Sequence, residues 1–83
     1  SPDSSITVTG HTDDVPISNG QFRDNWDLGA GRAASVVQAI QSTGLISGDR
    51  LSAVSKGEMA PLADNNTAAG REQNRRIEIE ISY

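Results

Sequence analysis

Cysteine is absent from this chain of 83 residues, and aromatic residues are few. Without cysteine there are no disulfide bonds and no thiolate metal sites. The absence of cysteine does not indicate the cellular compartment, because such a chain suits reducing and oxidising surroundings alike. The aromatic residues are Phe22, Trp26 and Tyr83. We therefore expect a core built from Ile, Val, Leu and Ala side chains rather than from rings.

Long apolar runs and an excess of basic residues are missing as well. No stretch approaches the roughly 20 apolar residues of a membrane-spanning helix, and no basic segment leads into an apolar one as in a signal peptide. Any membrane anchor is therefore expected in a longer parent protein. The formal net charge of −4 argues against a nucleic-acid-binding protein, whose contact face is basic. We expect a ligand that is small or of mixed charge.

The hydrophobic pattern predicts one small domain over residues 1–83. Residues 6–9 alternate apolar and β-branched polar side chains, which is typical of a strand, and Gly10 ends it. After a polar loop over residues 13–24, Asp24 caps a helix that ends near Thr43, with Gly44 suited to the left-handed position beyond it. The remaining pattern predicts a strand at residues 50–56, a loop at 58–66, a short helix at 67–74 and a strand at 75–82.

A strand, a helix and a second strand of these lengths imply a parallel pair joined by a right-handed crossover. The long helix has one apolar stripe that we expect to be buried, formed by Trp26, Ala30, Ala33, Val37 and Ile40. In the last strand, alternation turns three isoleucines inward, Ile77, Ile79 and Ile81. These elements leave the long helix without a partner on its second side, so we expect a further strand and helix before residue 1.

The candidate site lies where the first strand ends, in the run His11-Thr12-Asp13. Ligand sites of α/β units lie beyond the carboxyl ends of strands, so the Asp13 carboxylate and a guanidinium from the following helix can form a paired-charge pocket. Arg32 supplies that guanidinium. The structural alternative is that Asp13 and Arg32 only neutralise each other as an ion pair.

One flank of the helix adds to this site. Asn25, Gly29 and Arg32 lie at positions i, i+4 and i+7, which share a flank. A helical glycine costs about 1 kcal/mol relative to alanine. Such a cost near a helix start indicates that something comes close to the backbone, and Gly29 leaves a bare patch between Asn25 and Arg32.

Two other groups have a structural and a functional interpretation. His11 and Asp13 share a strand face and are potential zinc or iron ligands. Further obvious ligands are missing, so a hydrogen-bonded structural histidine is the simpler interpretation. Asn74, Arg75 and Arg76 lie between the last helix and the last strand. They either cap the helix C-terminus or reach the pocket rim, with Asn74 and Arg75 nearer the ligand.

Three motifs, in order along the chain, resemble the OmpA-like C-terminal domain family, which binds peptidoglycan. They are residues 6–13 (Ile-Thr-Val-Thr-Gly-His-Thr-Asp), residues 25–28 with 32–33, and residues 66–79. Within the family, residues 14–16 and the Asn-Trp-Asp-Leu run at 25–28 are most similar to the periplasmic domains of MotB-type flagellar stator proteins. The resemblance implies an α+β fold, a β/α sandwich with a mixed sheet and helices on one face.

The same resemblance implies a periplasmic module without catalytic activity, cofactor or metal, which grips the diaminopimelate of the peptidoglycan stem peptide. Its parent is expected to be a membrane-anchored protein. The family pattern makes Asp13 and Arg32 the principal contacts. The expected ligand-binding residues are Asp13, Arg32, Thr12, Asn25, Gly29, Asn74 and Arg75. Gly29 replaces the family's usual serine, so one supporting hydrogen bond is lost.

Diaminopimelate ends in an ammonium and a carboxylate on one carbon, so a carboxylate acceptor and a fork-shaped guanidinium suit it. Two other functions stay open. The strand at residues 75–82 can pair with its own copy in a homodimer, or His11 and Asp13 can serve a metal-dependent cell-wall hydrolase.

Overall fold

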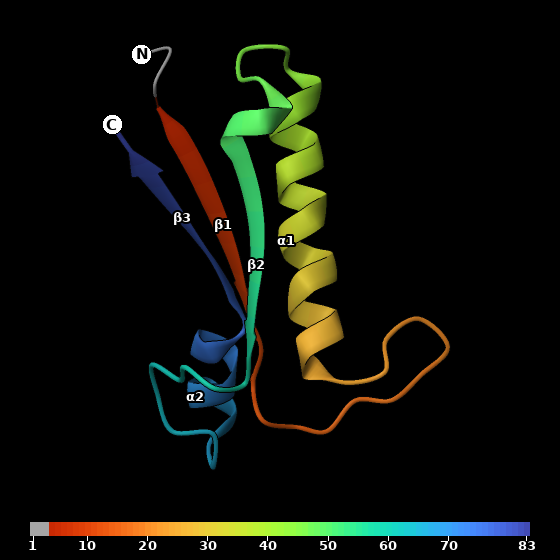
Figure 1. Ribbon diagram of the computed structural model, residues 1–83. Helices are drawn as coiled ribbons and strands as arrows, with labels where there is room; N and C mark the ends of the chain where they lie inside the picture. Colours follow the sequence, from red (N-terminus) through yellow and green to blue (C-terminus); the bar gives the residue numbers. More distant parts are fainter. Residues whose placement is uncertain (1–3) are drawn as a thin grey trace.

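The computed structural model describes residues 4–83 (Figure 1). The elements follow in the order β1 (Ser5–His11), α1 (Asn25–Ser42), the 3-10 helix η1 (Gly48–Arg50), β2 (Leu51–Gly57), α2 (Ala68–Asn74) and β3 (Arg76–Ser82). The predicted strands and helices are confirmed, and only the short η1 was not predicted. One end was wrong, because β1 continues through Gly10, which was expected to end it, to His11. Neither α-helix in the described part of the chain has the length and apolar character that a membrane crossing requires.

The three strands form one mixed sheet in the order β2-β1-β3. β1 is parallel to β2, as predicted, and antiparallel to β3. In Figure 1, α1 runs along the sheet, whereas α2 lies at the lower end, where β1 and β2 finish. The carboxyl ends of the parallel strands and the short helix therefore meet at one end of the molecule.

The ends of α1 follow from its capping residues. The Asp24 side chain accepts a hydrogen bond from the backbone N–H of Asp27 at 2.9 Å, which satisfies one of the free donors of the first turn. At the other end, Gly44 takes a left-handed conformation with φ of 75°, which glycine adopts without steric cost. Both capping predictions are confirmed.

The core lies between α1 and the β1–β2 half of the sheet. Ile6, Val8 and Ala33 are buried, and around them pack the partly buried side chains of Val36, Val37, Ile40, Ile46, Leu51 and Ile77. α1 packs mainly on β1 and β2, whereas β3 lies at the sheet edge and adds Ile77 to the core.

Two burial predictions were wrong. Ile79 and Ile81 are 54% and 48% exposed, because α1 does not reach far enough to cover the edge strand. Trp26 is 48% exposed and Ala30 is exposed too, because α1 turns the neighbouring positions Asn25, Gly29 and Ala33 toward the sheet.

Candidate functional site

The candidate site is built where β1 ends. The backbone N–H of Thr12 donates to the carbonyl of Gly57 at 2.8 Å, which continues the contact with β2 beyond the strand. The Thr12 hydroxyl donates to the carbonyl of Asp13 at 2.8 Å. Thr12 and Asp13 are both buried, so this turn holds the Asp13 carboxylate in a defined position.

Both oxygens of the Asp13 carboxylate have partners. Oδ1 accepts from the backbone N–H of Val15 at 3.0 Å, and Oδ2 accepts from Nη1 of Arg75 at 2.7 Å. The Asp13 side chain is 12% exposed and that of Arg75 is 42% exposed. Hydrogen bonds between charged groups are short and strong. The structure therefore places a shielded carboxylate behind a guanidinium that faces solvent.

Asn25, the first residue of α1, ties three segments together at this end. Its Nδ2 lies 3.3 Å from the carbonyl of Asp13, 3.1 Å from the carbonyl of Val15 and 3.4 Å from Oε1 of Glu58. Asn25 is buried, so it supports the site from beneath. Glu58 was not predicted. It follows β2 directly, and the rule that parallel strands end at one edge of a sheet would have singled it out.

The expected bare patch at Gly29 is corrected. Something does come close to the Gly29 backbone, but it is the protein itself. A β-carbon on Gly29 would lie 2.4 Å from Oγ of Ser55 and 2.9 Å from the carbonyl oxygen of Gly10. Gly29 therefore lets α1 pack tightly on β1 and β2, and it is closed to a ligand.

Arg32 is not brought into contact with Asp13. Its side chain is exposed, and within residues 4–83 it forms no ion pair. The alternative of a structural Asp13–Arg32 ion pair was therefore wrong, since Arg75 occupies that position beside Asp13.

Asn74 is fully buried and holds the loop before α2. Its Oδ1 accepts from the backbone N–H groups of Leu62 and Ala63 at 2.8 and 3.0 Å. Its Nδ2 donates to the Ala63 carbonyl and to Oδ1 of Asn65. With its amide satisfied in this way, Asn74 orders the loop and does not reach the site surface, so its placement at the ligand is corrected.

His11 is buried, as expected of a structural residue, but the expected hydrogen bond is missing. Its Nε2 lies 3.4 Å from Oε1 of Glu78, and neither ring nitrogen has a hydrogen-bond partner among the described residues. Residues 4–83 contain no group of three or more histidine, aspartate or glutamate side chains that could hold a metal ion.

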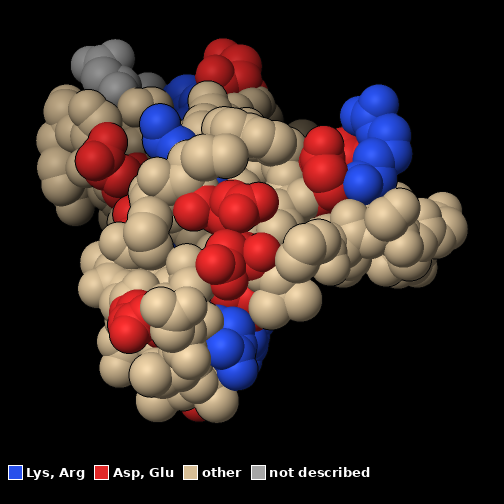
Figure 2. Space-filling view, turned by 90° about the horizontal axis from the view of Figure 1, so that it is seen from below, with Lys and Arg blue, Asp and Glu red and all other residues tan. Residues whose placement is uncertain are grey.

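Acidic side chains gather on the end of the molecule seen in Figure 2, with basic side chains at its margins. The Arg76 guanidinium donates to Glu78 at 2.7 Å, and this bond lowers the pKa of the Glu78 carboxyl. Arg23 donates to both oxygens of Asp27, at 2.7 and 3.0 Å, and so lowers the pKa of Asp27 to about 2. Both carboxyls are therefore ionised at neutral pH.

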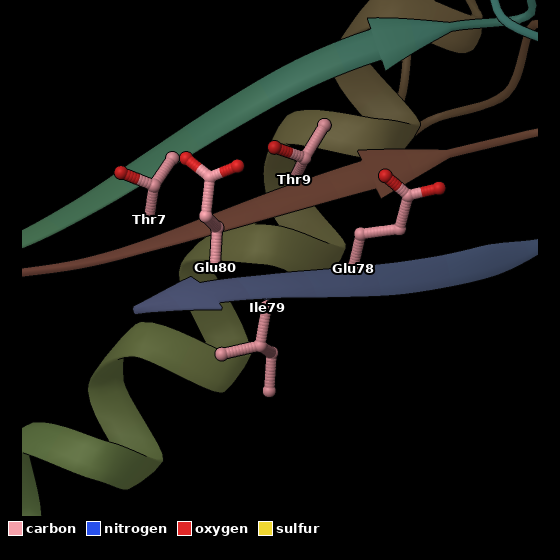
Figure 3. A pocket seen from close by; sticks show the side chains of 5 residues that line it. All are labelled: Thr7, Thr9, Glu78, Ile79 and Glu80. Atoms are coloured by element: carbon pink, nitrogen blue, oxygen red, sulfur yellow. The ribbon is translucent and has the colours of Figure 1, made fainter. Parts of the chain in front are cut away.

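A separate hollow of about 430 Å³ lies on the sheet, lined by Thr7, Thr9, Glu78, Ile79 and Glu80. In Figure 3, the threonine and glutamate side chains point to the face of the sheet that α1 does not cover. None of the predicted ligand-binding residues lines it. The paired charges of the candidate site lie instead beyond the end of β1.

Comparison with known proteins identifies the family. The OmpA family model matches residues 1–75. Motility protein B of Bacillus subtilis is 39% identical over 80 residues, which is 96% of this chain and 31% of that protein. The peptidoglycan-binding protein ArfA of Mycobacterium bovis is 36% identical over 81 residues, 98% of this chain and 23% of that protein. This chain thus spans less than a third of these relatives.

The fold is also that of a solved relative. The periplasmic domain of Helicobacter pylori MotB superposes with a TM-score of 0.85 at 34% identity, covering 95% of this chain and 50% of that one. Motif, fold and sequence agree over nearly the whole chain. The chain belongs to the OmpA family.

Proposed function

We propose that this domain binds peptidoglycan without covalent chemistry and so anchors a larger membrane or motor protein to the cell wall from the periplasm. The observation that carries the proposal is the Asp13–Arg75 pair, an acceptor and a half-exposed donor 2.7 Å apart at the end of the sheet. A relative named as a peptidoglycan-binding protein and a solved periplasmic domain of a motility protein support it.

The ligand group that fits this pair is a zwitterion, as at the free end of diaminopimelate. Its ammonium donates to Asp13, and its carboxylate accepts from Arg75, which can pair with a carboxylate through two N–H groups. Arg32 is exposed and forms no ion pair among residues 4–83. It would add a second guanidinium beside that of Arg75, and it is the one that the family resemblance assigns to the ligand. Thr12 and Asn25 act by holding the turn at Asp13, since the Thr12 hydroxyl and the Asn25 amide both donate to the Asp13 carbonyl.

Sedimentation with purified sacculi tests the proposal. The unmodified domain should pellet with sacculi, whereas Asp13→Ala and Arg75→Ala should stay in the supernatant. Asp49→Ala is the matched control for Asp13→Ala. It also removes one aspartate carboxylate, but at η1, at the opposite end of the molecule from α2 (Figure 1). Equal pelleting of all these proteins would refute a role for the pair, and no pelleting of the unmodified domain would refute wall binding.

Competition identifies the ligand group. A stem peptide that contains diaminopimelate should release the domain from sacculi, whereas the same peptide with lysine at that position should not, because within the peptide only diaminopimelate keeps a free carboxylate beside its side-chain ammonium for Arg75 to hold. Release by both compounds at equal concentration would mean that the second carboxylate is not recognised.

A second candidate function is dimerisation through β3. In its favour, β3 lies at the sheet edge with Ile79 and Ile81 about half exposed. One feature counts against pairing along the whole of β3. If two copies of β3 paired antiparallel around Ile79, Glu78 of one copy would lie opposite Glu80 of the other, and like charges opposite each other are destabilising. Light scattering at increasing protein concentration tests this candidate, and a constant monomer mass would exclude it.

A further inference from the structure

Trp26 lies beside the candidate site with 48% of its surface exposed. Two sets of contacts place it there. The preceding residue, Asn25, donates to the carbonyl of Asp13. Gly57, which lies beside the indole, accepts the hydrogen bond from Thr12. Trp26 therefore adjoins two residues, Asn25 and Gly57, that each form a hydrogen bond with the turn at Thr12 and Asp13.

The indole lies beside Gly57, a residue without a side chain. Gly57 has φ of 52°, and a β-carbon built on it would lie 3.4 Å from Cδ2 of Trp26. Gly57 thus has no side chain to cover this part of the ring, and about half of the Trp26 surface faces solvent. A large ring with only two side-chain torsions loses little conformational entropy when a ligand covers it.

The surroundings of the ring combine an apolar surface with a hydrogen-bond acceptor. Glu58, next to Gly57, is only partly buried, and Asn25 donates to its Oε1. Its other oxygen can accept further hydrogen bonds. A sugar ring presents C–H groups on its faces and hydroxyl donors on its rim. The C–H groups suit the negative face of an indole, and the hydroxyls suit a carboxylate.

We propose that Trp26 is a stacking platform for a sugar ring of the glycan strand. The proposal rests on the proposed function, and it adds glycan recognition to recognition of the stem peptide. An extended peptide spans roughly 3.5 Å per residue, so a stem peptide held at Asp13 and Arg75 keeps its glycan within a few residues' reach. Trp26 would then favour peptide that is still attached to the glycan.

Fluorescence tests this contact directly, because Trp26 is the only tryptophan of the chain. Two ligands are compared, a disaccharide-peptide muropeptide and the same stem peptide without sugars, with binding of each measured by calorimetry. The muropeptide should shift or quench Trp26 emission, and the bound stem peptide should leave it unchanged. An equal change with both ligands, or no change with bound muropeptide, would overturn the proposal.

Variants supply the second measurement. Trp26→Ala should weaken muropeptide binding about tenfold and leave stem-peptide binding unchanged, whereas Trp26→Phe should retain most of the affinity. Leu45→Ala is the matched control, because Leu45 is an apolar residue that is 85% exposed and lies beyond the other end of α1. Equal weakening for both ligands would overturn the proposal. If the unmodified domain bound neither the two ligands nor sacculi, both the stacking role and the proposed function would be refuted. If it bound sacculi normally but its Trp26 emission did not change with bound muropeptide, only the stacking role would be refuted.

Discussion

Arg75 donates to the carboxylate of Asp13 at 2.7 Å although the two residues are 62 positions apart in the sequence. The register of the sheet explains the contact. β3 runs antiparallel to β1, and Arg76 lies opposite His11. The residue before Arg76 is therefore set beside the residues that follow His11, so strand pairing brings the two charges together.

A double-mutant cycle measures this pair. Arg75→Ala and Asp13→Ala should each lower the free energy of unfolding by about 1 kcal/mol, and the double variant should lose less than the sum. The same cycle with Arg32→Ala in place of Arg75→Ala should show no coupling, because Arg32 does not contact Asp13. Urea unfolding gives the free energies. Coupling of Asp13 to Arg32 as large as to Arg75 would contradict the placement described here.

Gly29→Ala should destabilise the domain although alanine favours a helix. A β-carbon at residue 29 would lie 2.4 Å from Oγ of Ser55 and 2.9 Å from the Gly10 carbonyl, so we expect a loss of about 1–3 kcal/mol. Gly31→Ala, in the same helix, is the control. There the nearest atom is on the Phe22 ring, which can move, so the change should be close to zero. Thermal unfolding that ranked the two variants in the reverse order would refute the close packing at Gly29.

Asn74→Ala should loosen the loop between β2 and α2. The substitution leaves the backbone N–H groups of Leu62 and Ala63 without their acceptor, so we expect a loss of about 2–3 kcal/mol. Hydrogen exchange at these two amides should become faster. Asn66→Ala, an exposed asparagine of the same loop, should change stability by less than about 0.5 kcal/mol. Unchanged protection of both amides in Asn74→Ala would show that the loop is held by other contacts.

Acid should weaken the start of α1 through Asp27. Hydrogen bonds from Arg23 lower the pKa of this carboxyl from 3.8 to about 2 in the folded domain. Because the folded pKa is depressed, the stabilisation is complete above the ordinary value and is lost as the pH falls toward 2. The difference in urea midpoint between the unmodified domain and Asp27→Asn should therefore be constant near neutral pH and shrink below about pH 4. Arg23→Gln should behave alike, and a difference that stayed constant down to pH 2 would count against the pair.

Local patterns in the sequence account for most of the secondary structure. Asp24 and Gly44 mark the ends of α1 because capping depends on residues within one turn. The alternation in β1 and β3 likewise depends only on neighbours. The family resemblance, carried by motifs at residues 6–13, 25–28 with 32–33, and 66–79, identified the family that the comparison establishes.

The sequence by itself thus determined the strands and α-helices, their order, the parallel β1–β2 pair and the position of Asp13 at the end of β1. The tertiary structure decided which cation lies beside Asp13, what fills the space at Gly29, and that Trp26 and Ile79 face outward. The physical reason is that these outcomes depend on strand register and on the rotation and reach of α1 over the sheet. Both are settled by packing between residues far apart in the chain, which no local pattern records.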